Sequence, residues 1–343
     1  MVAGIHVLLS GNNIIKHNKV YDLPYSGIVA TGEILNALYT LQKNNIIEKN
    51  HIHNTNQILH DGAAINIRGR QPGSVIKENL VHDILLTSHH RKTNGVQGIY
   101  LDEGSNEILI EKNLVYRTGT NNLLFHSVYN NTARNNIFAD AGQASVSLVK
   151  YRGFPYKDGN TNVYASENIF MNNVVYNSDT SVPTFHVKFG NSNENNSLSA
   201  SQLNVYSHFL VLQQVRSSYH NRDLSWWSDP NGLDTVSTII DPRFNDYEND
   251  DFGLRNESHA LNWGFEQLEL EDVGPTNECF YDSECESKGL DCCKMGMCVS
   301  ENDCIVQFDT GGTTNNGGTT GGGGRNGGRS GGGGGDDSFI NNF

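Results

Sequence analysis

Two stretches decide the fold: DGAAINIRG at residues 61–69 and GIYLDEGSNEILIEKNLVY at residues 98–116. In both, a glycine comes before a short run of alternating apolar residues, as in a β-strand with one buried face. The two stretches therefore read as successive turns of one repeating coil. Each turn also carries an acid that a folded core does not require: Asp61 in the first, and Asp102 beside Glu103 in the second.

An eight-residue phrase recurs along the chain and indicates the architecture. Its copies are NIIKHNKV (13–20), NIIEKNHI (45–52), SVIKENLV (74–81) and ILIEKNLV (108–115), with degenerate copies NTARNNIF (131–138) and VYASENIF (163–170). The asparagine in the sixth place falls at residues 18, 50, 79, 113, 136 and 168, so its spacing varies between 23 and 34 residues. Such spacing is typical of one structural unit with loops of unequal length. Because the strands are short and lack helical periodicity, we predict an all-β, right-handed parallel β-helix of about six to eight coils over residues 10–240.

Stacking of the coils predicts two columns of side chains. Coils about 4.8 Å apart would place Ile14, Ile46, Val75 and Leu109 in one internal column, because no coil can bury its apolar face alone. The phrase asparagines would form a second column at a tight corner, where asparagine tolerates left-handed dihedrals and stacked amides bond one another. We expect these asparagines to be structural rather than to bind sugar.

Composition divides the chain into a β-helix at 1–275, a cysteine-rich module at 276–306 and a glycine-rich tail at 307–343. Residues 241–274 follow the pattern DP-x-F … D-F-x-L … S-x-A-L … G-F, which we interpret as a cap over the unpaired edge of the last coil. The tail has almost no apolar residue and predicts a disordered tether. The other end shows no cap, so we expect Met1 to begin inside a coil of a longer protein.

All six cysteines lie between residues 279 and 304. Disulfides would supply the stability that so short a module cannot obtain from a core. The spacing C-x5-C-x6-CC-x4-C-x5-C resembles the inhibitor cystine-knot family. That resemblance implies the pairs Cys279–Cys293, Cys285–Cys298 and Cys292–Cys304. A zinc site is the alternative, which adjacent cysteines without interleaved histidines disfavour.

Charge and composition limit the partners. The formal net charge of −14 argues against nucleic acid and anionic membrane surfaces. It also favours a neutral polysaccharide over an acidic one, unless a local basic groove overrides the total. No stretch approaches the roughly 20 apolar residues that a spanning helix needs. The cysteines indicate an oxidising compartment, so we expect a secreted protein, although the N-terminus lacks the basic region of a signal peptide. We also expect the protein to be a monomer and to need no cofactor.

The residues suited to chemistry form a row across the coils. Eleven residues before the closing asparagine stand Tyr39, Arg68, Asp102 and, one place shifted, His126, and Lys150 would continue the row. We expect the alternating neighbours Ile65, Ile67, Ile99, Leu101, Leu123 and Phe125 to face inward, and Asn66, Arg68, Tyr100, Asp102 and His126 to face outward. The row predicts a sugar-binding groove with Arg68, Tyr100, Glu103, His126 and Lys150 as substrate-binding groups. An ordinary charged sheet face is the alternative.

The phrases DGAAI and GIYLDEGS, the repeat phrase and the 241–274 pattern resemble right-handed parallel β-helix proteins related to glycoside hydrolase family 141. That family contains α-L-fucosidase and xylanase activities. The resemblance covers roughly residues 10–274 and does not reach the cysteine module. It implies that Asp61 and Asp102 are a catalytic pair.

Two carboxyl groups suit the cleavage of a glycosidic bond, which needs one acid and one nucleophile or base. Asp102, flanked by Arg68 and His126, suits the nucleophile or base, and Asp61 suits the acid if burial raises its pKa. A strictly extended chain would hold the two too far apart. The 55–62 loop must therefore fold back over the groove, or Glu103 or Asp83 must serve instead.

Two other interpretations compete with a hydrolase. A polysaccharide lyase would use Lys150 or Arg152 as the base near Ca²⁺ held by Asp102 and Glu103. A non-catalytic carbohydrate-binding or matrix protein is favoured by the cysteine module and the glycine-rich tail.

Overall fold

The computed structural model describes residues 3–32, 41–89, 95–150, 154–155, 162–163, 167–189, 198–208, 211–215, 218–228, 234, 236–275, 292–294 and 297–299. The chain forms two compact units, Met1–Glu278 and Cys279–Phe343. In the second unit, β29 (Cys292–Lys294) pairs antiparallel with β30 (Met297–Val299). The cysteine side chains lie outside the described part of the chain, so the disulfide pairing stays a prediction.

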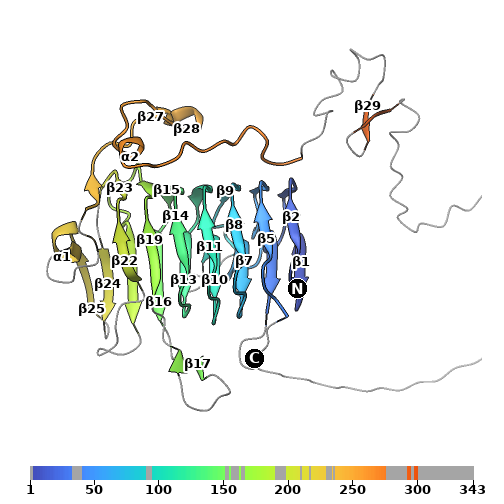
Figure 1. The fold of residues 1–343 in the computed structure, drawn as a ribbon, viewed down its shortest axis with the longest axis horizontal. Coiled ribbons are helices and arrows are strands. Elements are labelled where there is room, and N and C mark those ends of the chain that lie inside the picture. Colours follow the sequence, from blue (N-terminus) through green and yellow to red (C-terminus); the bar gives the residue numbers. More distant parts are fainter. Residues whose placement is uncertain are drawn as a thin grey trace, which may run out of the picture. The chain divides into compact units, whose positions relative to one another are not determined.

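The first unit is the parallel β-helix that the repeats predict (Figure 1). Its nine-stranded sheet contains β1 (Ile5–Leu8), β4 (Ile28–Thr31), β7 (Gly62–Arg68), β10 (Val96–Asp102), β13 (Asn121–His126), β16 (Ala144–Lys150), β21 (Phe185–Phe189), β24 (Val211–Val215) and β25 (Ser218–Arg222). Neighbouring strands in this sheet pair in parallel, except that β25 folds back antiparallel on β24.

Two further sheets complete each coil, and their strands also pair in parallel. The seven-stranded sheet contains β2 (Ile14–Lys16), β5 (Ile46–Glu48), β8 (Val75–Lys77), β11 (Leu109–Glu111), β14 (Thr132–Arg134), β19 (Asn168–Met171) and β22 (Leu198–Gln202). The eight-stranded sheet contains β3 (Lys19–Tyr21), β6 (His51–His53), β9 (Leu80–Ile84), β12 (Leu114–Thr118), β15 (Ile137–Ala141), β20 (Val174–Tyr176), β23 (Val205–Tyr206) and β26 (Thr238–Ile239).

The core fills the space between the three sheets. The predicted inward residues of β7, β10 and β13 are all at most 2% exposed, so the alternation is confirmed there: they are Ile65, Ile67, Ile99, Leu101, Leu123 and Phe125. With one face of each strand buried in this way, the opposite face must point outward.

The predicted internal column of the seven-stranded sheet is wrong by one residue. Ile14, Ile46, Val75 and Leu109 do stack in register, but they face outward, and Ile14 is 61% exposed. The buried column consists of the next residues, Ile15, Ile47, Ile76 and Ile110. These strands have three residues and begin with two apolar ones, so alternation alone cannot decide which of the two points inward.

The asparagine ladder is confirmed between the seven-stranded and eight-stranded sheets. The side chain amides bond from coil to coil at 2.8–3.2 Å through Asn18, Asn50, Asn79, Asn113, Asn136, Asn173 and Asn204. Asn168, which the repeat phrase placed in this ladder, instead accepts from Asn131 in a second ladder. The left-handed residue is also not the asparagine but the one before it, as at Lys49 (φ 53°) and Glu78 (φ 54°).

The segment 241–274 does not cap the last coil, contrary to the sequence interpretation. Its elements β27 (Phe244–Asp246), η1 (Tyr247–Asn249), β28 (Asp251–Leu254) and α2 (His259–Asn262) pack their apolar residues on the outer face of the eight-stranded sheet (Figure 1). That face is apolar at Leu114, Ile137 and Val174, so the segment covers surface that would otherwise contact water. The end of the core instead contains Trp227 from α1 (Leu224–Ser228), whose ring stacks on Phe185 at 5.3 Å.

Within the described ranges, no helix has the length and apolar character needed to span a membrane.

Candidate active site groove

The outer face of the nine-stranded sheet carries two rows of side chains that the parallel register defines. One row runs across the coils through Thr31, Arg68, Asp102, His126, Val149 and Lys188. The second runs two residues earlier through Val29, Asn66, Tyr100, Leu124, Ser147 and His186. The predicted adjacency of Arg68, Asp102 and His126 is therefore confirmed.

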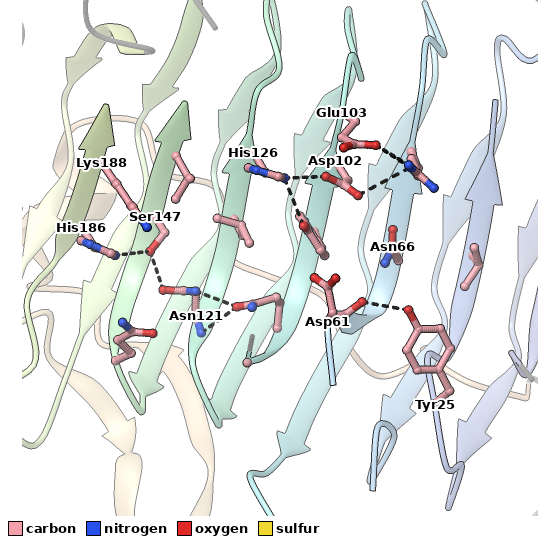
Figure 2. A pocket seen from close by; sticks show the side chains of 18 of the residues that line it. Tyr25, Asp61, Asn66, Asp102, Glu103, Asn121, His126, Ser147, His186 and Lys188 are labelled. Carbon is pink, nitrogen blue, oxygen red and sulfur yellow. Dashed lines mark hydrogen bonds and ion pairs between the residues drawn. The ribbon is translucent and has the colours of Figure 1, made fainter. Parts of the chain in front are cut away.

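These rows line a groove with a volume of about 630 Å³, which also includes Tyr25, Asp61, Gln97, Glu103, Asn121 and Gln143 (Figure 2). Strands from six successive coils contribute to it, from β4 to β21. An elongated groove of this kind is suited to a ligand that extends across the coils.

Asp102 lies at the centre of a hydrogen-bonded group. The Nδ1 of His126 donates to the Oδ1 of Asp102 at 2.6 Å, and the hydroxyl of Tyr100 lies 3.2 Å from the same ring nitrogen. The Asp102 side chain is only 15% exposed, although it faces the groove. Burial, and then the charge of Asp102, raise the pKa of Tyr100, so this hydroxyl keeps its proton at neutral pH.

Arg68 connects the two adjacent acids. Its Nε donates to the Oε2 of Glu103 at 2.9 Å and lies 3.8 Å from the Oδ2 of Asp102. Glu103 follows β10 directly and adopts a positive φ of 26°, which turns its side chain towards Arg68. The guanidinium therefore holds the acids at the end of β10 in place.

Asp61 reaches the groove from the loop before β7. Its backbone has a left-handed φ of 60°, its amide donates to Gly95, and its carbonyl accepts from the Tyr25 hydroxyl at 2.8 Å. Burial, and then the nearby Asp102 carboxylate, raise the pKa of Asp61. The side chain remains open to solvent in the groove, so water screens part of this effect.

The loop before β7 places Asp61 in the lining of the same groove as Asp102. Figure 2 shows Asp61 in the same groove as Asp102. Asp83, the other candidate acid, lies on the far side of the coil, where Arg117 and His82 bind it and hold its pKa at about 2. Asp83 is thus not among the groove residues.

Two members of the predicted row differ in the structure. Val149, not Lys150, pairs with His126, and Thr31, not Tyr39, pairs with Arg68. Long insertions after β4 and after β16 hide the register, because the repeat phrase does not immediately follow these strands. Tyr39 and the side chain of Lys150 lie outside the described residues.

Sequence reasoning missed the part of the groove beyond His126. There the amide of Asn121 donates to Gln97 at 2.7 Å, the hydroxyl of Ser147 donates to Asn121 at 2.6 Å, and Nδ1 of His186 lies 3.5 Å from Ser147. Lys188 follows His186 on the same face of β21. The alternation in FHVKF could have identified both residues, had the register of β21 been known.

No group of three or more histidine, cysteine, aspartate or glutamate side chains within the described ranges is arranged to hold a metal ion.

Comparisons with known proteins give distant similarities only. No family model matches the chain, and no curated protein matches it. The solved structure of the periplasmic alginate epimerase AlgG shares 13% identity at a TM-score of 0.38 over 63% of this chain and 45% of that chain. The complex of XylC with xylose shares 14% identity at a TM-score of 0.37 over 77% of this chain and 47% of that chain.

A third solved structure, DFA-IIIase from Arthrobacter chlorophenolicus A6 in complex with GF2, shares 15% identity at a TM-score of 0.24 over 64% of this chain and 57% of that chain. The chain thus spans about half the length of these proteins. The parallel register of the strands, rather than these similarities, defines the fold.

Proposed function

We propose that this protein is a carbohydrate-active β-helix protein, a secreted glycoside hydrolase that cleaves a cell-wall polysaccharide in the groove of the nine-stranded sheet. The observation that carries the proposal is the presence of two acids with different surroundings in one groove. Asp102 is held by His126, Tyr100 and Arg68, whereas Asp61 lies on a loop and has a raised pKa.

In the proposed mechanism, Asp61 protonates the oxygen of the leaving sugar while Asp102 acts on the sugar ring or on a water molecule. A carboxyl group with a raised pKa suits the first role, because it keeps a proton to donate. A carboxylate fixed by hydrogen-bond donors suits the second role, because it is oriented and needs little reorganisation during the reaction.

The resemblance to glycoside hydrolase family 141 makes fucosides and xylan the first substrates to test. The wild-type chain and Asp102→Asn would be assayed for the release of reducing ends from xylan and for the hydrolysis of aryl fucosides and aryl xylosides. We expect Asp102→Asn to lower kcat by about a thousandfold or more with the fold intact, since a groove side chain contributes little to core burial.

A matched control is Asp22→Asn, an exposed acid away from the groove, which should keep wild-type turnover. Asp61→Asn should be less harmful on aryl glycosides with good leaving groups than on xylan, because such groups need little acid help. Full turnover of Asp102→Asn would remove this residue from the mechanism.

A second candidate, a polysaccharide lyase, is favoured by the hydrogen bond between Asp102 and His126. The Asp102 carboxylate accepts the bond from Nδ1 and so orients the ring, but Nε2 is buried, and a lyase would need the ring to turn towards the groove before Nε2 could take a proton from a substrate. In that case Asp102 orients the base rather than attacking the sugar. Unsaturated products that absorb ultraviolet light, lost in His126→Gln, would establish the lyase, whereas a hydrolase produces none.

A further inference from the structure

One amide side chain in the groove is buried without a partner. Asn66 on β7 is only 8% exposed, and within the described ranges its carboxamide makes no hydrogen bond to the protein. Figure 2 shows its side chain in the groove, with no dashed line to any of the residues drawn. An amide that is buried without hydrogen bonds costs free energy, so its presence here needs an explanation.

Packing does not require an amide at this position. In the parallel register, Asn66 stands between Val29 on β4 and Tyr100 on β10, and Leu124 follows on β13. Apolar or aromatic side chains thus take the same place in the neighbouring coils. A leucine or a valine at position 66 would satisfy the sheet equally well, without the cost of an unpaired amide.

The other buried amides of the groove bond one another instead. The amide of Asn121 donates to Gln97 at 2.7 Å, and the oxygen of Asn121 accepts from the Ser147 hydroxyl at 2.6 Å. These bonds give both amides a role in holding the sheet. The donor and the acceptor of Asn66, by contrast, are both open to a ligand in the groove.

Asn66 lies next to the proposed catalytic centre. It pairs with Tyr100 across β7 and β10, and two residues further along the same strands Arg68 pairs with Asp102. A strand spacing of about 4.8 Å and two residues of about 3.3 Å each place the backbones of Asn66 and Asp102 roughly 8 Å apart. A sugar ring held at Asp102 can therefore reach Asn66 with its hydroxyl groups.

We propose that Asn66 is a specificity-determining residue of the groove, which binds two neighbouring free hydroxyls of the sugar ring held at Asp102. Its carbonyl oxygen accepts from one hydroxyl, and its NH2 group donates to the oxygen of the other. The acids Asp61, Asp102 and Glu103 line the same groove and disfavour an anion there, so the ligand is a neutral sugar. This inference rests on the proposed function for the place of the sugar ring.

Asn66→Leu tests the subsite, because leucine has nearly the shape of asparagine but neither donates nor accepts a hydrogen bond. Calorimetry on the intact chain would measure its affinity for neutral oligosaccharides derived from xylan, glucan and mannan, and urea denaturation would measure its stability. The control is Thr132→Val, which also replaces a polar by an apolar side chain. Thr132 stands between Leu109 and Ile169 on the outer face of the seven-stranded sheet, away from the groove.

We expect the wild type to bind at least one of these oligosaccharides, and Asn66→Leu to weaken that binding by about tenfold or more, while Thr132→Val leaves it unchanged. The urea midpoint of Asn66→Leu should equal or exceed that of the wild type, because the substitution removes an unpaired buried amide. An amide with a structural role would give the opposite pattern, a lower midpoint without a specific loss of binding.

The subsite would be overturned by equal affinities of Asn66→Leu and the wild type, by a clear fall in the urea midpoint of Asn66→Leu, or by a wild-type chain that binds none of the oligosaccharides. Binding that depends on Asn66 without any release of reducing ends would contradict the proposed hydrolase and leave the subsite supported. Release of reducing ends by Asn66→Leu, at the affinity of the wild type, would do the reverse.

Discussion

At the scale of single residues, the two proposed catalytic acids are held by different means. The parallel register fixes Asp102 between Arg68 and His126, so its position follows from the sheet itself. Asp61 has a left-handed backbone that two hydrogen bonds hold in place: its carbonyl accepts from the Tyr25 hydroxyl, and its amide donates to the carbonyl of Gly95. The same left-handed conformation occurs at many corners of the coils, so it positions Asp61 without by itself marking the residue as functional.

The raised pKa of Asp61 leads to a prediction for the pH dependence of activity. A general acid works only while protonated, so kcat/KM should fall as the pH rises through the pKa of Asp61. That alkaline limb should lie above the ordinary aspartate value of 3.8. Profiles on xylan should show this limb in the wild type, whereas profiles on aryl glycosides with good leaving groups, which need little acid help, should show it weakly in the wild type and not in Asp61→Asn. A limb that persists in the variant would assign it to another group.

At the scale of the elements, the asparagine ladder secures the corner between two sheets. Asn79 is fully buried, donates to the carbonyls of Ile47 and Lys77 and to Asn113, and accepts from the amide of Asn50. The left-handed residue before each ladder asparagine makes the corner, and the amide satisfies the backbone groups that the corner leaves unpaired.

Removing one ladder amide should therefore be costly. Asn79→Ala leaves several buried donors and acceptors without partners, and we expect it to lower the free energy of unfolding by about 3 kcal/mol or more. Urea denaturation would measure the change, with Asn249→Ala as the control, because Asn249 is exposed and lies in the segment 241–274 outside the ladder. A cost for Asn79→Ala similar to the control would show that the ladder contributes little.

The outer face of the eight-stranded sheet carries a histidine cluster on β6 and β9, which are among the first strands of this sheet in the sequence. The Nε2 atoms of His51 and His82 lie 2.8 Å apart, and His53 stacks between Tyr21 and His82. Burial, and then the charges of His82, His53 and Lys19, lower the pKa of His51 to about 4. Protonation of this histidine is therefore disfavoured in the folded state.

This lowered pKa predicts that the fold loses stability in mild acid. The unfolded chain binds the proton at an ordinary histidine pKa near 6.5, so the contribution of His51 to stability declines as the pH falls from about 6.5 to about 4. Urea midpoints at pH 7 and pH 5 would show the decline, and His51→Gln should reduce it. The stability contributed by the Asp83 ion pair is lost only below this window, as the pH falls from about 3.8 towards about 2. An unchanged difference between the two pH values in His51→Gln would contradict the assignment.

At the scale of the whole unit, the segment 241–274 stabilises the β-helix by covering one of its faces. The ring of Phe252 is buried against Tyr116 at 4.7 Å and Phe244 at 5.2 Å. Further along the segment, Lys49 pairs with Asp272 at 2.6 Å, which ties it to the early coils. The covering segment thus joins coils that are far apart in the sequence.

We expect Phe252→Ala to cost about 3 kcal/mol or more in the free energy of unfolding, because a buried aromatic ring is lost from this contact. Urea denaturation would measure the cost. The groove lies on a different sheet, so binding of oligosaccharides by the folded variant should stay within about twofold of the wild type. A large loss of binding with little loss of stability would show that the covering segment acts on the groove.

Much of this architecture could be predicted because the repeat phrase marks the same corner in successive coils. The register of Arg68, Asp102 and His126 followed from it, since the phrase comes soon after these strands. The phrase could not decide which residue of a three-residue strand points into the core. In the strand that begins at Ile14, for example, the first two residues are both apolar, and either could point inward. It also becomes degenerate from residue 131 on, which is why the row beyond His126 was assigned to Lys150 and Lys188 was not predicted.

The most direct test of the central claim is a crystal structure of Asp102→Asn with a bound oligosaccharide. The variant should retain the substrate uncleaved, because it lacks the proposed nucleophile or base. The account predicts a sugar chain across β7 to β21, with a glycosidic oxygen within hydrogen-bond distance of the Asp61 carboxyl group and the sugar ring beside the substituted side chain on β10. A sugar bound away from this groove, or bound with its glycosidic oxygen out of reach of Asp61, would contradict it.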